Sequence, residues 1–100
     1  MGKRLDLHTA LLRFTPNCYY QPPPSVRMQY PCFRYSLSRI VSKFADNRAY
    51  MNHKCYNVTY ISPDPAEGLV QEILSSFPYI RLDRSYTADE LYHYAFVLFY

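Results

Sequence analysis

Apolar residues recur at helical spacing near the start of the chain. Over residues 4–14 they form one broad stripe, and Pro16 ends the segment. This pattern predicts an amphipathic helix. The side chains expected on its apolar stripe are Leu5, His8, Leu11 and Leu12, with Leu7 at its margin.

A second helix is predicted between residues 65 and 76. Asp64 is the expected N-cap, Pro65 takes the first helical position, and Glu67 completes a capping box. The side chains expected in the core are Leu69, Val70, Ile73 and Leu74.

The middle of the chain shows strand patterns interrupted by prolines. The aromatic run 18–21 precedes three consecutive prolines, which lack an N–H donor, so it can form only a short or edge strand. A loop over residues 22–31 leads to a second strand, 32–37, with alternating apolar and polar positions. Residues 38–52 fit either a continued strand or a short helix, with a turn or exposed loop at 45–48.

Three further strands are predicted at residues 53–61, 79–86 and 91–100. The last is apolar on both faces, and a short connection near residues 87–90 makes the final two an antiparallel hairpin. In the strand 79–86, the side chains expected to share one face are Ile80, Leu82, Arg84 and Tyr86.

This order of elements predicts an α+β domain. We expect a mainly antiparallel sheet of four or five strands with two helices packed on one face. One hundred residues leave no room for a second core, so residues 1–100 are expected to form a single domain. Neither a membrane span nor a signal peptide is predicted, because no long apolar stretch occurs.

Aromatic content and charge both point toward protein contacts. The chain has 12 Tyr and 6 Phe, residues that are common both in sheets and at protein interfaces. Its net charge is +3, but residues 1–54 carry nine basic and two acidic residues, whereas residues 55–100 carry two basic and six acidic ones. Two interleaved halves would explain this division; a subunit with one basic and one acidic face would also explain it, and would favour head-to-tail contacts.

Patterns typical of catalysis or metal binding do not occur. Cys18, Cys32 and Cys55 are widely spaced, which favours free thiols, and His53 with Cys55 is the only close metal-ligand pair. Two glycines exclude a phosphate-binding loop. We therefore predict no catalytic residue, no cofactor, no metal and no small-molecule substrate.

Nucleic-acid binding is the main alternative among non-enzymatic functions. Basic residues are interleaved with aromatic ones between residues 27 and 48, as on surfaces that stack bases and bind phosphates. The small net charge favours weak electrostatic contact with DNA rather than base recognition.

Several segments resemble a family of small tail proteins of siphophages and prophages, the tail completion or tail terminator proteins. Residues 19–31, YYQPPPSVRMQYP, are similar to a family stretch of the form YFQPPxSVxMxYP. Further similar segments lie across the whole chain, in order. They are residues 3–8, 43–47, 50, 58–59, 64–65 and 82–91.

The resemblance implies a virion protein that forms a ring, usually a hexamer, at the head-proximal end of the tail. Such a ring caps the tail tube formed by the major tail protein and joins it to the head connector and neck proteins, while DNA passes through without sequence-specific contact. A connector component, or another phage protein-interaction module, is the alternative.

We expect subunit contacts from loops 22–31 and 43–51 and from the hairpin end at 84–90, because exposed loops often carry function. The expected aromatic anchors are Tyr20, Tyr30, Phe44, Tyr50 and Tyr86. The expected polar and charged contact residues are Arg27, Lys43, Asp46, Asn47, Arg48, Asp83, Arg84 and Asp89.

Overall fold

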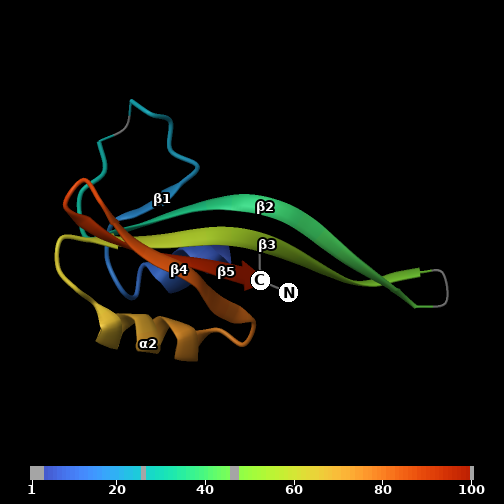
Figure 1. The fold of residues 1–100 in the computed structure, drawn as a ribbon. Coiled ribbons are helices and arrows are strands. Elements are labelled where there is room, and N and C mark those ends of the chain that lie inside the picture. Colours follow the sequence, from blue (N-terminus) through green and yellow to red (C-terminus); the bar gives the residue numbers. More distant parts are fainter. Residues whose placement is uncertain (1–3, 26, 46–47, 100) are drawn as a thin grey trace.

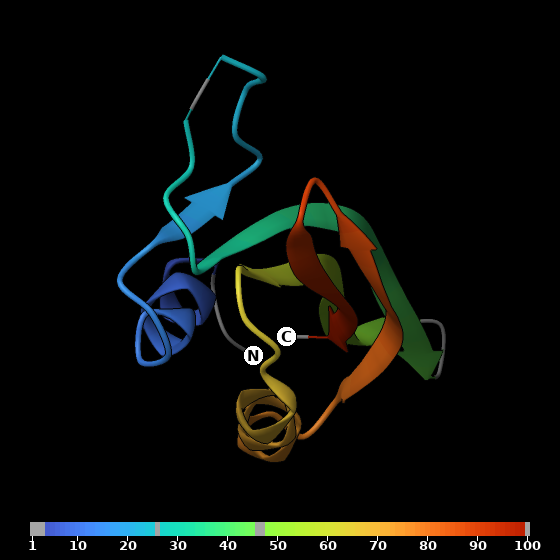
Figure 2. The same cartoon turned by 60° about the vertical axis from the view of Figure 1, so that its left-hand side comes forward.

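The computed structural model describes residues 4–25, 27–45 and 48–99, and over residues 39–53 it describes the backbone alone. Five strands form one sheet in the order β1-β2-β3-β5-β4, and two helices cover one of its faces (Figures 1 and 2). The elements are α1 (Arg4–Leu11), β1 (Cys18–Tyr20), β2 (Cys32–Ala45), β3 (Arg48–Ser62), α2 (Glu67–Ser76), β4 (Ile80–Ala88) and β5 (Leu91–Phe99). The predicted α+β class and element order are confirmed.

All strand pairs are antiparallel except β1 with β2, which run parallel. β1 has only three residues, because Gln21 adopts a positive φ of 43° and the three prolines follow it. The backbone N–H of Gln21 still donates to the Tyr35 carbonyl at 2.8 Å. The aromatic run is therefore a short edge strand, as predicted.

The core lies between the sheet and the two helices. Leu7 and Leu11 enter it from α1, and Val70 and Ile73 enter it from α2. The sheet contributes an aromatic layer made of Phe33, Tyr35, Tyr56, Tyr60, Tyr94 and Phe96. Much of the tyrosine excess is thus used in the core, where large rings supply most of the buried apolar area.

The first helix buries a narrower stripe than its sequence predicts. Leu7 and Leu11, one turn apart, are fully buried, whereas Leu5 is 65% exposed and Leu12 is 41% exposed. The helix ends at Leu11 rather than near residue 14, since the chain turns there and the Phe14 N–H donates to the Leu11 carbonyl. Leu12 therefore lies beyond the helical stripe.

The predicted capping box of α2 is wrong. The helix begins at Glu67 with Ala66 as N-cap, and no side chain caps it. Asp64 lies in the preceding turn, where its N–H donates to Ser62 Oγ at 3.1 Å. The Ala66 N–H donates instead to the Tyr94 hydroxyl at 3.1 Å, so a residue of β5 holds the start of this helix.

A β-bulge at Asp83 overturns the predicted alternation of β4. Leu82 pairs with Phe96 on the helix-covered face, and Arg84 pairs with Ala95 on the other face, so Asp83 is the extra residue. A single inserted residue reverses the direction of every side chain that follows. Ile80 and Leu82 therefore face the helices, whereas Arg84 and Tyr86 lie on the open face.

Strands β2 and β3 continue beyond the rest of the sheet as a two-stranded arm. The last β3–β5 pair is Cys55 with Phe99, and β1 reaches only Tyr35 on β2. From the pair Ile40–Lys54 to the pair Ala45–Arg48, the two strands pair only with each other. The arm extends to one side in Figure 1, and the molecule is 50 Å long in that direction.

Candidate functional site: the open face of the sheet

The sheet face opposite the helices carries polar side chains in rows across the strands. One row runs from Arg34 on β2 through Thr59 and Ala95 to Arg84 on β4. The neighbouring rows contain Ser36, Asn57, Val97 and Arg81 on one side and Cys32, Ile61, His93 and Tyr86 on the other. We call this surface the open face.

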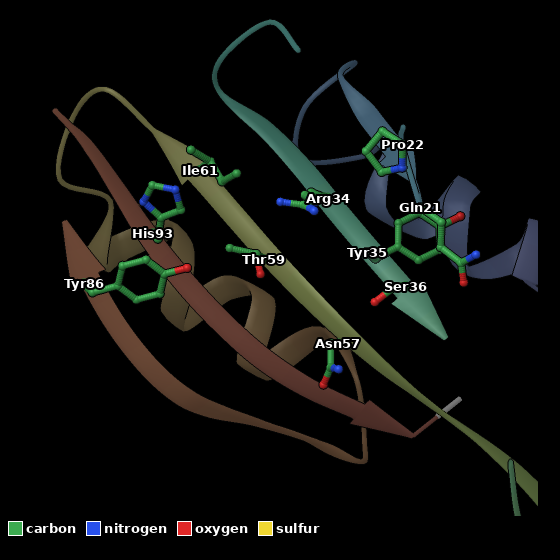
Figure 3. Close-up of a pocket in the computed structure, with 10 residues that line it drawn as sticks. All are labelled: Gln21, Pro22, Arg34, Tyr35, Ser36, Asn57, Thr59, Ile61, Tyr86 and His93. Atoms are coloured by element: carbon green, nitrogen blue, oxygen red, sulfur yellow. The ribbon is translucent and has the colours of Figure 1, made fainter. Parts of the chain in front are cut away.

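A hollow of about 440 Å³ lies on the open face (Figure 3). Gln21 and Pro22 stand at one end of it, and Tyr86 and His93 stand at the other, with the helices behind the sheet. The residues that line it are Gln21, Pro22, Arg34, Tyr35, Ser36, Asn57, Thr59, Ile61, Tyr86 and His93. They include one permanent cation, Arg34, and no carboxylate.

Tyr86 and His93 form a fixed aromatic wall. They are directly opposite each other on β4 and β5, and their rings stack at 4.7 Å with an angle of 10°. The Arg84 guanidinium lies 5.3 Å from the Tyr86 ring centre, a cation–π contact. His93 Nδ1 lies 3.1 Å from the Leu91 carbonyl, which can only accept, so Nδ1 carries the hydrogen.

The opposite wall is held by the segment that follows β1. Gln21 Oε1 accepts from the Leu37 N–H at 3.1 Å, and the Tyr19 hydroxyl accepts from the Gln29 N–H at 3.0 Å. These two bonds tie both ends of the proline-rich loop to the sheet. Pro22 and Arg34 also line a second hollow, of about 300 Å³, together with Pro23, Pro24 and Met28.

The chemistry of the open face is that of a hydrogen-bonding, positively charged surface. Guanidinium, hydroxyl, amide and imidazole groups provide donors, and nothing acidic lines the larger hollow. Such a surface can bind carboxylates through charge-assisted hydrogen bonds.

The structure also brings Cys18, His8 and Tyr35 together under α1, although they are far apart in the sequence. His8 Nδ1 lies 2.7 Å from the Tyr35 hydroxyl and 3.8 Å from Cys18 Sγ. Burial raises the pKa of the Cys18 thiol to about 12, and burial together with Arg4 lowers the pKa of His8. Both directions disfavour the thiolate–imidazolium pair of a reactive cysteine, so this cluster has the character of a neutral, hydrogen-bonded part of the core.

The thiols of the half-buried Cys18 and the buried Cys32 predict a loss of stability at alkaline pH. Burial raises the pKa of Cys18 from 9.0 to about 12 and that of Cys32 from 9.0 to about 11. In the unfolded chain these thiols ionise at a lower pH than in the folded protein. The free energy of unfolding therefore has its full value below pH 9 and falls as the pH rises toward 11–12. We expect the melting temperature, followed by circular dichroism, to fall steadily over this range. The Cys18→Ala variant should show a shallower fall, and an unchanged melting temperature up to pH 11 would contradict the prediction.

The predicted contact residues fall into three groups in the structure. Arg27, Tyr30, Asp83, Arg84, Tyr86 and Asp89 are exposed. Tyr20 is half-buried, because its ring packs on Tyr35 at 4.9 Å and lies under the Arg4 guanidinium at 4.4 Å. Asp46 and Asn47 lie outside the described residues, as do the side chains of Lys43, Phe44, Arg48 and Tyr50.

The predicted loop 43–51 is largely strand. Residues 43–45 belong to β2 and residues 48–51 belong to β3, so this segment is the far half of the arm. Among the predicted residues whose side chains are described, Arg84 and Tyr86 alone come together at the open face. The predicted site residues did not include Asn57, Thr59 or His93. On β3, the polar residues Asn57 and Thr59 alternate with Tyr56 and Tyr60, and this alternation was a signal for a second, polar face.

Over the described part of the chain, no three His, Cys, Asp or Glu side chains are arranged to hold a metal ion. No helix in the same residues has the length and apolar character needed to cross a membrane. Comparison of the chain with protein-family models, with curated proteins and with solved structures gave no match.

Proposed function

We propose that this chain is a structural subunit of a bacteriophage tail, which assembles with copies of itself into a closed ring. The ring caps the tail tube at its head-proximal end and joins it to the head connector. The observation that carries the proposal is the β2–β3 arm. The resemblance of residues 19–31 to tail completion proteins is the reason for placing the ring in a phage tail.

The arm has the properties of an element that needs a neighbour. Its six residue pairs, from Ile40–Lys54 to Ala45–Arg48, extend roughly 20 Å at the usual rise of a strand. An isolated two-stranded ribbon is at best marginally stable in water, and both of its outer edges leave backbone N–H and C=O groups unpaired. Packing against an adjacent subunit would cover these groups.

The direction of the arm favours a ring over a simple pair. The arm leaves from one side of the sheet, whereas the open face and the helices lie on other surfaces of the molecule (Figures 1 and 2). A contact between an arm and a different surface of the next copy is heterologous, and such contacts close into rings when the rotation allows.

The proposal is tested by measuring the mass of the purified chain by light scattering and by imaging it with electron microscopy. We expect a ring whose mass is a whole multiple of 11.9 kDa. Labelled antibody should also bind particles at the junction of head and tail. A protein that stays monomeric at every concentration, and that is absent from purified particles, would overturn the proposal.

A further inference from the structure

The open face of the sheet and helix α2 carry charges of opposite sign. The open face presents Arg34, Arg81 and Arg84, all exposed. Helix α2, on the other side, presents Glu67 and Glu72, also exposed, and contains no basic residue. Asp64, just before the helix, adds a third exposed carboxylate. We call these two surfaces the arginine face and the acidic helix.

The acidic helix and the arginine face lie on opposite sides of the sheet. They approach each other only at the end of the β4–β5 hairpin, where Glu67 lines a hollow of about 220 Å³ together with Tyr86 and His93. Figure 3 shows α2 behind the strands whose front side forms the larger hollow. Surfaces of opposite charge on opposite sides of one subunit are complementary when copies are arranged head to tail.

We infer that, in the ring proposed above, the acidic helix of one subunit docks on the arginine face of the next. This inference rests on the proposed ring and names the surfaces that build it. The carboxylates of Glu67 and Glu72 reach toward Arg34 and Arg84 of the neighbour, where guanidinium groups can form paired hydrogen bonds with each carboxylate.

The hydrogen bonding of α2 supports this assignment. Ser75 Oγ donates to the Gln71 carbonyl at 2.9 Å, and Ser76 Oγ donates to the Glu72 carbonyl at 2.7 Å. Both hydroxyls are thus directed to their own helix. Glu67, Gln71 and Glu72 remain as the long polar side chains on its exposed side.

The arrangement of Tyr86 favours a protein partner over a nucleic acid. Single-stranded nucleic acids bind to aromatic rings whose faces are free to stack on bases. The Tyr86 ring already stacks on His93 at 4.7 Å and lies beside the Arg84 guanidinium at 5.3 Å. The arginines beside it are therefore the groups that this surface offers to a partner.

A charge-exchange experiment tests the contact. One variant carries Arg34→Glu with Arg84→Glu, and the other carries Glu67→Lys with Glu72→Lys. Each variant alone should lose the ring and run at the mass of a single chain, because like charges then face each other. An equimolar mixture should recover the ring, since an alternating ring has opposite charges at every contact. Arg13→Glu, at an exposed position after α1 and away from both surfaces, is the control and should assemble as the wild type does.

The outcomes separate this contact from the ring itself. Circular dichroism of each variant must match the wild type, so that a lost ring is not a lost fold. If the wild type and both variants form the same ring, the proposed contact is wrong and the proposed ring is unaffected. If the first variant keeps the ring but loses affinity for single-stranded DNA, the arginine face binds nucleic acid instead. If the wild type never assembles, alone or with tail components, the proposed ring and the proposed contact are both wrong.

Discussion

Shortening the β2–β3 arm is expected to abolish assembly and leave a folded, monomeric protein. In this variant an Asn-Gly turn replaces residues 41–53 and connects Ile40 to Lys54, which are paired in the structure. The backbone described for residues 41–53 pairs only within the arm and with no other strand, so the melting temperature should change by only a few degrees. Light scattering should show the mass of one chain at concentrations where the wild type forms rings.

A matched control keeps the arm and changes only the two residues between β2 and β3 in the sequence. The substitutions Asp46→Asn and Asn47→Gly introduce the same two turn residues without shortening the strands, and this variant should assemble normally. A shortened protein that still forms rings would remove the arm from the interface. The arginine face and the acidic helix would then have to provide the contacts alone.

The arm is also the segment whose secondary structure could not be decided from the sequence. Local patterns were sufficient for the element order, because most segments alternate clearly and prolines mark the breaks. Residues 38–52 gave no clear period, and both a strand and a short helix fitted them. Residues 40–45 and 48–54 pair only with each other, and strands that belong to no wider sheet need not alternate strictly between apolar and polar residues.

Two other errors have long-range causes. The capping box around Asp64 satisfied every local rule, but the Tyr94 hydroxyl, 28 residues away, accepts the hydrogen bond from the Ala66 N–H instead. In β4, the bulge at Asp83 moved Arg84 and Tyr86 to the open face. Neither the bulge nor the pairing of Tyr86 with His93 is encoded by the spacing of residues within one strand, so the hollow could not be predicted from the sequence.

Removing the Phe96 ring is expected to cost a large part of the stability of the fold. Phe96 is 1% exposed and lies at the centre of β5, paired with Val58 on β3 and Leu82 on β4. Phe96→Ala loses the apolar transfer energy of the ring and leaves a cavity, which together cost about 3–5 kcal/mol. Domains of this size are stable by about 5–15 kcal/mol, so the variant should be close to unfolding at room temperature.

Urea denaturation measures this loss directly, with Val97→Ala as the matched control. Val97 is the next residue of β5 and lies half-buried on the open face, between Asn57 and Arg81. The Val97→Ala change removes less buried surface than Phe96→Ala does. It should lower the free energy of unfolding by about 1 kcal/mol, the transfer free energy of two partly buried methylene-sized groups. The large difference between adjacent positions follows from the alternation of β5 between the aromatic core and the open face. Equal losses at the two positions would mean that the open face is covered in the folded monomer, and the hollow would then not be available to a partner.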